Sequence, residues 1–362
     1  MRIVFIAPEL PQGPIAEHVR LLAERHDVVV GLTDVRPAGE ARIGKAKVVA
    51  VEATLGSEAD VAVATHWRGT VRLFEVKAER FVFWVDSFAN QRPESEPLVS
   101  VLAYDLPVDF IAAATWAAQA LEQLRPDARI ITARNGAEAV KRSPGGDKLR
   151  VFVDDSTVQG TPGLMALKRM KTPHSQAKSL ADADVALFLD PVDGVLDATL
   201  VAARSGVIPV VLPAGGQTDL VKNMESGIVG QPEDTLGVAR SLDRLQADAA
   251  LRQRLSAGAV AAAEGWPDWD GASKEFERAL KQIASKAPPE SAAWPLRLMA
   301  DAAAVGTVQH LQTRQLSRDL NDERVSRSPV RRAVRKVKRS RLLTPIRIAG
   351  SRFVPDRIKK LG

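Results

Sequence analysis

Short runs of apolar, often β-branched residues recur along the first part of the chain. They predict strands at 2–7, 27–32, 46–51, 60–64, 81–85, 110–114 and 129–133. After the first run, Ile15, Val19 and Leu22 are spaced for one face of a helix. Because the runs have hydrophobic residues on both strand faces, they favour parallel strands that are covered on both sides by helices.

A glycine-rich stretch, Asn135-Gly136 followed by Ser-Pro-Gly-Gly-Asp at 143–147, separates a second series of the same kind. Strands are predicted at 149–153, 184–189, 208–212 and 227–230, and helices at 162–170, 236–264 and 271–284. Between 153 and 184 there is room for about one helix. We therefore expect 148–285 to form a smaller sheet, of four to five parallel strands.

Proline and glycine breaks divide the chain further. The predicted organisation is an N-terminal Rossmann-like domain at 1–145 and a C-terminal Rossmann-like domain at 146–285. A helical connector at 286–322 begins near Pro288-Pro289, and a basic tail covers 323–362.

Composition adds several exclusions. An apolar content of 45% over 362 residues suits two domains. Without cysteine the chain has no disulfide and no thiolate metal site. No apolar stretch approaches the length of a membrane-spanning helix, and the apolar run at the start is too short for a signal peptide. These features predict a cytoplasmic protein.

The charge is unevenly distributed. From Arg324 onward there are 14 lysines and arginines and one acidic residue, out of 50 and 44 in the whole chain, so the rest of the chain is net negative. Intermittent apolar residues follow the basic run. This pattern predicts a peripheral contact with the anionic inner face of a membrane. The membrane-binding residues would be Arg331, Arg332, Arg335, Lys336, Lys338, Arg339 and Arg341.

Two other interpretations of the tail stay open: a disordered, solvated segment and an arm for nucleic acid. An acidic body would repel phosphate, and Phe353 is the single aromatic residue available for stacking there. Nucleic acid is therefore not expected as a partner.

Several catalytic motifs are missing or incomplete. The stretch Gly39 to Lys45 resembles a phosphate-binding loop but lacks the Ser or Thr that would hold magnesium. Neither GxGxxG nor GxSxG occurs, and the five histidines include no pair at helical ligand spacing. We therefore expect no metal. Gly215-Gly216, after the strand at 208–212, remains as bare backbone that a ligand could approach closely.

Four groups of residues, in this order along the chain, together match one known pattern. They are Arg2–Pro8 with Gly13 and His18-Val19-Arg20-Leu21-Leu22; Ala113-Ala114-Thr115-Trp116 with Asn135-Gly136; Ala181-Asp182-Ala183-Asp184-Val185, Pro209-Val210-Val211 and Gly215-Gly216 to Asp219; and Pro232-Glu233-Asp234 with Trp269-Asp270. Through these groups the chain resembles the retaining, two-domain GT-B glycosyltransferases of family 4 over about residues 1–284, and more loosely their bacterial rhamnosyltransferase branch.

The resemblance implies an α/β, GT-B fold of two Rossmann-like domains with a cleft between them. It implies transfer of a sugar from a nucleotide-sugar donor to a glycan or lipid-linked acceptor of cell-envelope polysaccharide synthesis, with no cofactor and no metal. An alternative is a catalytically silent relative that serves as a binding or scaffold protein at the membrane.

The resemblance also implies site residues. His66 and Asp86 follow two strands of the first domain, where a doubly wound fold places ligands, and are the catalytic candidates. A surface histidine and a turn-forming aspartate are the alternatives. The donor-binding candidates are Gly13, Asn135, Asp193, Gly194, Asp197, Gly215, Gly216 and Asp219. In this reading, backbone N–H groups near Gly215-Gly216 meet the diphosphate.

The sequence departs from the family at the donor site. Val201 stands where the family has the glutamate that holds the ribose, so Asp197, one helical turn earlier, is a candidate substitute. Asp155-Ser156 and Gln159-Gly160 stand where the family has a basic residue and a Lys-Gly pair. Lys168 and Arg169 are candidate replacements for the lost positive charge.

Overall fold

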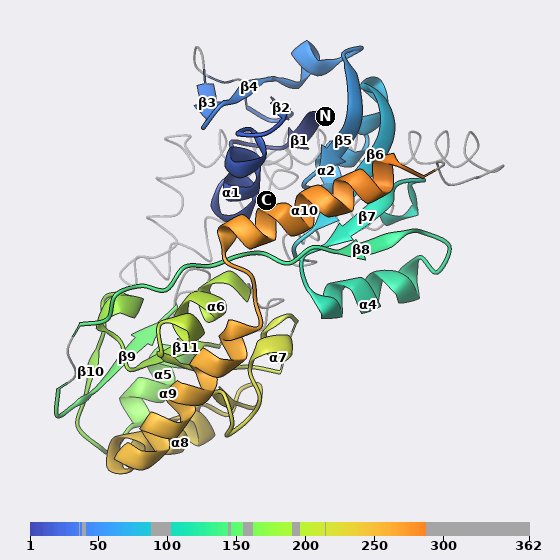
Figure 1. Cartoon of the computed structure of the whole chain (residues 1–362). Coiled ribbons are helices and arrows are strands. Elements are labelled where there is room, and N and C mark those ends of the chain that lie inside the picture. The colour runs from blue at the N-terminus through green and yellow to red at the C-terminus, as the bar shows by residue number, and fades with distance from the viewer. Residues whose placement is uncertain are drawn as a thin grey trace, which may run out of the picture. The chain divides into compact units, whose positions relative to one another are not determined.

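The computed structural model describes residues 1–35, 37, 41–87, 103–143, 146–154, 162–189, 196–213 and 215–286. Within these ranges the chain forms two β-sheets with helices packed against them (Figure 1). Several predictions lie outside the described residues: those for Asp155-Ser156, Gln159-Gly160, Asp193 and Gly194, for the connector beyond residue 286, and for the basic tail. No helix in the described ranges is both long and apolar enough to cross a membrane.

The first sheet has eight strands in the order β3-β4-β2-β1-β5-β6-β7-β8. Their bounds are β1 Arg2–Ala7, β2 Asp27–Leu32, β3 Ala41–Ile43, β4 Ala46–Ala50, β5 Glu58–Ala64, β6 Lys77–Val85, β7 Asp109–Ala112 and β8 Ile130–Thr132. All pairings are parallel except that of β3 with β4. Since β2 lies on one side of β1 and β5 on the other, the direction of winding reverses between β1 and β5.

The strand β3 is an addition to the predicted set. It has only three residues, none of them fully buried, and it turns back onto β4 through Gly44, whose φ of 58° is left-handed. A strand this short and exposed leaves no hydrophobic run in the sequence, which is why periodicity missed it.

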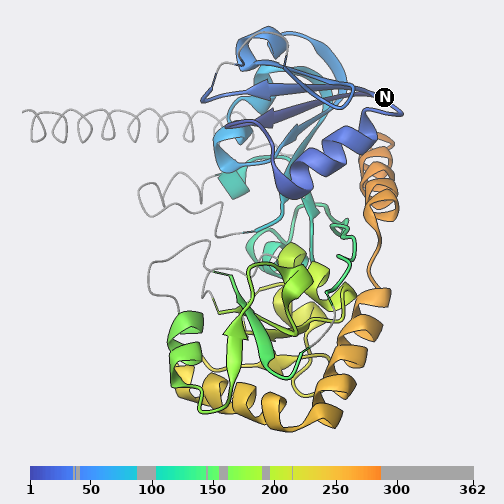
Figure 2. The same ribbon diagram turned by 90° about the vertical axis from the view of Figure 1, so that its left-hand side faces the viewer.

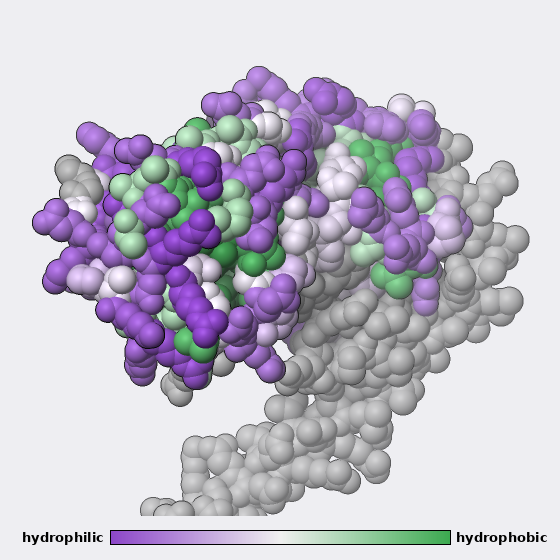
Figure 3. Space-filling model, turned by 90° about the horizontal axis from the view of Figure 1, so that it is seen from below, coloured by the Kyte–Doolittle hydropathy of each residue, from purple (hydrophilic) through white to green (hydrophobic). Residues whose placement is uncertain are grey.

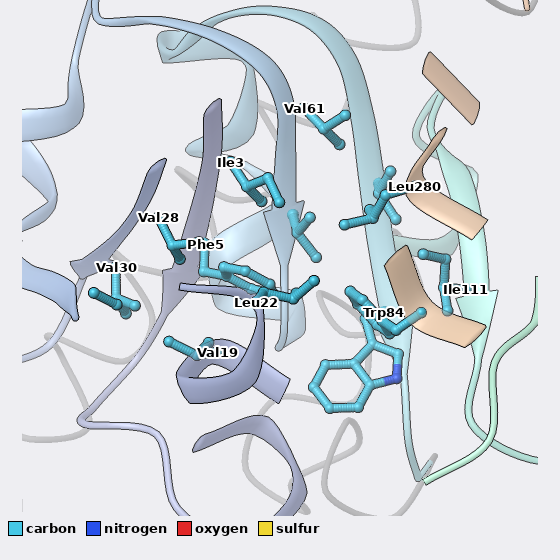
Figure 4. Close-up of a cluster of buried hydrophobic side chains, with 14 of the residues drawn as sticks. Ile3, Phe5, Val19, Leu22, Val28, Val30, Val61, Trp84, Ile111 and Leu280 are labelled. Carbon is cyan, nitrogen blue, oxygen red and sulfur yellow. The ribbon is translucent and has the colours of Figure 1, made fainter. Parts of the chain in front are cut away.

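Helices and short 3₁₀ turns connect these strands. They are α1 Gly13–Leu22, α2 Trp67–Thr70 and α4 Thr115–Leu124, with 3₁₀ turns at Val51–Thr54, Leu73–Glu75 and Ala103–Asp105. Helix α1 begins with proline in its first turn and buries His18, Val19 and Leu22. It thus packs the predicted apolar face on the sheet. Figure 4 shows the resulting core, in which Phe5 of β1 and Trp84 of β6 lie among aliphatic side chains.

The second sheet has five parallel strands in the order β10-β9-β11-β12-β13, which confirms the predicted smaller sheet. Their bounds are β9 Leu149–Val153, β10 His174–Gln176, β11 Val185–Phe188, β12 Ile208–Val211 and β13 Ile228–Val229. The prediction of about one helix between 153 and 184 agrees with α5, but the structure adds a strand that was not predicted. Helix α5, Pro162–Arg169, is followed there by the short edge strand β10, whose polar residues gave no strand pattern.

The helices of this half are α6 Leu196–Arg204, α7 Gln217–Leu220, α8 Thr235–Ala247 and α9 Ala249–Glu264. The single helix predicted at 236–264 is therefore wrong, because the chain breaks at Asp248. The Asp248 N–H bonds the Arg244 carbonyl at the end of α8, and its carboxylate accepts the Leu251 N–H at the start of α9. An aspartate that serves as both C-cap and N-cap ends one helix and begins another.

The last described helix, α10 Trp269–Ala284, packs on the first sheet although it follows the second in sequence. Phe276, Ala279, Leu280 and Ile283 are buried in the same core as Ile3 and Phe5. In Figure 2, α9 accompanies the second sheet and α10 the first. The boundary at 145/146 stays a prediction. The packing places α10 with the N-terminal half, whereas the predicted division grouped 271–284 with the C-terminal half.

Candidate functional site

A pocket of about 680 Å³ opens at the carboxyl ends of β1, β2, β5 and β6. This is the edge of the first sheet where the winding reverses between β1 and β5, the usual ligand position in open α/β sheets. The loop at 8–14 forms one wall, and Asp197 of α6 contributes from the second half of the chain. Four predicted site residues line this pocket together: Gly13, His66, Asp86 and Asp197.

Gly13 opens α1 at the pocket wall. Its φ is 55°, and a side chain built there would meet no atom within 4 Å, so glycine serves the left-handed backbone and not a tight contact. No side chain caps the N-terminus of α1. The first turn of this ten-residue helix therefore carries backbone N–H groups and a partial positive charge at the pocket.

His66 follows β5 and caps the four-residue helix α2. Its Nδ1 accepts the Arg68 backbone N–H at 3.2 Å, so the neutral ring carries its proton on Nε2. Arg68 in turn makes an ion pair with Asp34 at 2.7 Å and lies over the Trp67 ring. Two of the opposite charges that line the pocket thus neutralise each other.

Asp86 and Asp197 are a carboxylate pair from opposite halves of the chain. Asp86 comes directly after β6, and Asp197 lies in the first turn of α6. Burial, and to a smaller extent the negative charge of Asp86, raise the pKa of Asp197 to about 7. A hydrogen bond from the Asn135 amide opposes both effects. Near neutral pH the pair can therefore hold or release a proton.

Asn135 is buried, with 4% of its surface exposed, and does not line the pocket. Its Nδ2 donates to the Asp197 carboxylate at 3.2 Å, and its Oδ1 faces His18 Nε2 at 3.2 Å. The contact of His18 with Asn135 was not predicted from the sequence. A histidine on the apolar face of α1, beside Val19 and Leu22, was the available signal, since a buried polar side chain needs a partner.

The predicted contact surface at Gly215-Gly216 lies elsewhere. The residues that line the pocket do not include Gly215, Gly216 or Asp219. A Cβ at Gly216 would lie 2.7 Å from Trp116 Nε1, so the indole covers this glycine. Asp219 accepts the Trp116 backbone N–H at 3.3 Å. The absence of a side chain at Gly216 thus makes room for Trp116 of the same chain.

None of the residues discussed for the family's lost donor contacts, Val201, Lys168 and Arg169, lines the pocket. Val201 packs against a core cluster formed by α6, α9 and neighbouring strands, in agreement with a purely structural role. Arg169 hydrogen-bonds the Thr235 hydroxyl at the start of α8, and Lys168 is exposed on α5. In the described ranges, no group of three or more histidine and carboxylate side chains is arranged to hold a metal ion.

No protein-family model and no curated protein sequence matches the chain. Solved structures do. The structure of Anabaena Alr3699/HepE in complex with UDP-glucose matches with a TM-score of 0.61 at 12% identity, covering 78% of this chain and 100% of that chain. A sucrose-phosphate synthase from Thermosynechococcus elongatus matches with a TM-score of 0.60 at 11% identity, over 78% of this chain and 99% of that one.

A glycosyltransferase from Rickettsia africae is similar at a TM-score of 0.54 and 8% identity, over 79% and 99% of the two chains. At sequence identities this low, the structural similarity establishes the fold and not the activity. The shared architecture is two α/β sheets, here of eight and five strands. The chain has the GT-B fold.

Proposed function

We propose that this protein is a glycosyltransferase that uses a nucleotide-sugar donor. The observation that carries the proposal is the pocket at the switch point of the first sheet, where Gly13, His66, Asp86 and Asp197 converge. The similar structures support it, since Anabaena Alr3699/HepE binds UDP and UDP-glucose in this architecture.

The pocket offers distinct groups to each part of such a donor. Carboxylates accept hydrogen bonds from sugar hydroxyls, and two of them, Asp86 and Asp197, lie in the same wall region. The open N-terminus of α1 suits a phosphate oxygen. His66 Nε2–H is a donor for an oxygen that gains negative charge as the bond to the leaving diphosphate breaks.

In this mechanism the anomeric carbon exchanges its bond to the diphosphate for a bond to an acceptor hydroxyl. The hydroxyl proton passes to the departing diphosphate, so the protein positions the reactants and stabilises charge. We place the acceptor among glycans or lipid-linked sugars of the cell envelope. The basic tail would hold the enzyme at the membrane where a lipid-linked acceptor lies.

A silent relative is the second candidate, and specific contacts favour it. Trp116 occupies the space beside Gly216, Val201 belongs to the core, and Arg169 bonds Thr235. The indole covers a glycine that the resemblance assigns to the donor, Val201 offers no polar group to a ribose, and Arg169, a candidate replacement cation, is engaged elsewhere. Such a protein would bind a glycan or a partner enzyme without transferring sugar.

Calorimetry with UDP-, GDP- and dTDP-sugars tests the proposal directly. We expect one donor class to bind, and we expect Asp86→Asn and His66→Ala to weaken this binding. His174→Ala, on the edge strand β10, is the matched control and should bind like the unmodified chain. If no donor binds at millimolar concentration, the silent relative replaces the transferase.

A further inference from the structure

Three buried or half-buried polar side chains are linked by hydrogen bonds from the core of the first sheet to the pocket. His18 is fully buried and its ring lies against Phe276, Trp84 and Trp269, with centroid distances of 4.8, 5.3 and 5.6 Å. From this aromatic setting its Nε2 reaches Asn135, and Asn135 reaches Asp197. This series of hydrogen bonds ends at Asp197, one of the two carboxylates of the carboxylate pair in the pocket.

Chemistry fixes the direction of each hydrogen bond. An ionised Asp197 only accepts, so the NH₂ group of Asn135 must face it and the amide oxygen must face His18. His18 Nε2 therefore carries the proton. Burial lowers the pKa of His18 to about 4, against the smaller opposing effect of Asn135, so the ring stays neutral. While Asp197 is ionised, this orientation of the amide satisfies both neighbours.

The backbone around Asn135 is held as firmly as its side chain. Gly136 lies so close to α10 that a Cβ would be 2.7 Å from the Asp268 carbonyl oxygen and from the Trp269 backbone. Arg134 makes an ion pair with Glu275 of α10 at 2.9 Å and bonds the Gly265 carbonyl at 2.8 Å. Asn135 therefore cannot relax toward a new position without moving α10.

We propose that His18 and Asn135 are positioning residues, which fix the Asp197 carboxylate in the pocket wall so that it accepts hydrogen bonds from the hydroxyl groups of a sugar. This role rests on the proposed function for its ligand, but the hydrogen-bonded chain exists without one. In this role Asn135 acts on the donor only through Asp197 and does not contact it, and His18 in the core acts through Asn135. The charged and titratable side chains that line the pocket with Asp197 are Glu9, Asp34, His66, Arg68 and Asp86.

Carbon-13 NMR of aspartate carboxyl groups tests the positioning without any nucleotide sugar. The Asp197 signal, assigned by its loss in Asp197→Asn, should titrate with a pKa near 7 in the unmodified chain. Asn135→Leu removes the amide and should shift this pKa upward by about one unit, the size of a hydrogen bond to a charged group. His18→Gln keeps a donor and should leave the pKa close to its original value, whereas His18→Leu should raise it.

An Asp197 titration that is the same in all these variants would overturn the proposal. If the variants fail to fold, the unmodified chain still decides, because the side-chain amide protons of Asn135 should shift as Asp197 titrates, and constant amide shifts would overturn the proposal. Where a donor sugar binds, Asn135→Leu should weaken it about tenfold and leave the sugar-free nucleoside diphosphate unaffected. Equal loss of both ligands would contradict the assignment to sugar hydroxyls.

Discussion

The side chains of His18, in the core, and Asp197, at the pocket, give the free energy of unfolding opposite dependences on pH. His18 has a folded pKa of about 4 against 6.5 in the unfolded chain, so its contribution is lost as pH falls below 6.5. Asp197 has a folded pKa of about 7 against 3.8, so its contribution is lost as pH rises from 4 to 7. The two slopes offset each other over most of this range.

Asp197→Asn removes one of these slopes and should expose the other. Relative to the unmodified chain, the variant should gain about 3 kcal/mol in the free energy of unfolding as pH rises from 4 to 7, because the folded state no longer confines a charge. Urea unfolding at pH 4, 5.5 and 7 measures the difference. A constant difference across the three pH values would contradict the raised pKa.

A substitution at Gly216 tests how tightly Trp116 packs against this glycine. Gly216→Ala places a methyl group against Trp116 Nε1 and should cost about 1–3 kcal/mol of stability, the usual range for overpacking. Gly146→Ala is the matched control, since a Cβ there meets no atom within 4 Å. Thermal unfolding of both variants compares them. Equal losses of stability in the two variants would mean that the Trp116 indole moves aside without a loss of packing energy.

The sequence allowed some of these residues to be found and not others. Gly13, His66 and Asp86 follow predicted strands or open a predicted helix, and parallel strands bring their carboxyl ends to one edge. The partnership of His18 with Asn135 joins residues 117 apart in sequence, which no local pattern encodes. The cover over Gly216 likewise depends on Trp116, about one hundred residues earlier.

At the scale of elements, α10 is the part whose place could not be inferred from order along the chain. Its amphipathic pattern predicted a helix near 271–284, but the pattern does not say which sheet receives the apolar face. The same limit applies to β3 and β10, three-residue strands that depend on their neighbours for pairing. The long apolar strands, in contrast, were predictable because burial on both faces requires continuous hydrophobic residues.

A substitution at Phe276 measures how much the packing of α10 on the first sheet contributes to the free energy of unfolding. Its ring is fully buried and lies 4.8 Å from His18 and 5.3 Å from Trp84, so Phe276→Ala should cost about 3–5 kcal/mol. Leu236→Ala, at a position 43% exposed on α8, should cost far less. Chemical denaturation compares the two. Similar losses would mean that α10 adds little to the stability of the first sheet.

At the scale of the whole molecule, surface and charge decide which partners are available. The described part of the face shown in Figure 3 is mainly hydrophilic, and hydrophobic residues form small patches among polar ones. The large hydrophobic side chains exposed in the described ranges are Leu10, Val35, Leu55, Leu124, Val140, Met165 and Leu236, of which Leu10 and Val35 line the pocket. The strongest candidate contact surface is therefore the charge of the tail, which remains a prediction from sequence.

The tail prediction is tested with the full chain and a chain that ends at Asp322. We expect 1–362 to sediment with anionic vesicles at low salt and to be released at high salt, because basic residues each contribute about 1 kcal/mol near such a surface. The shorter chain should stay in the supernatant. Equal recovery of both chains in the supernatant, or tighter binding of the full chain to DNA, would contradict membrane binding.

The tight packing of Asn135-Gly136 also has a consequence for the chemical lifetime of the protein. In a flexible chain an asparagine before glycine readily loses ammonia, because the glycine amide nitrogen reaches the side-chain carbonyl carbon; here α10 prevents that approach. Peptide mapping by mass spectrometry after alkaline incubation should find Asn135 intact in folded protein and converted to aspartate or isoaspartate in urea. Conversion would replace the amide that donates to Asp197 by a second carboxylate, so an aged molecule that had once unfolded would refold without this hydrogen bond to the pocket aspartate.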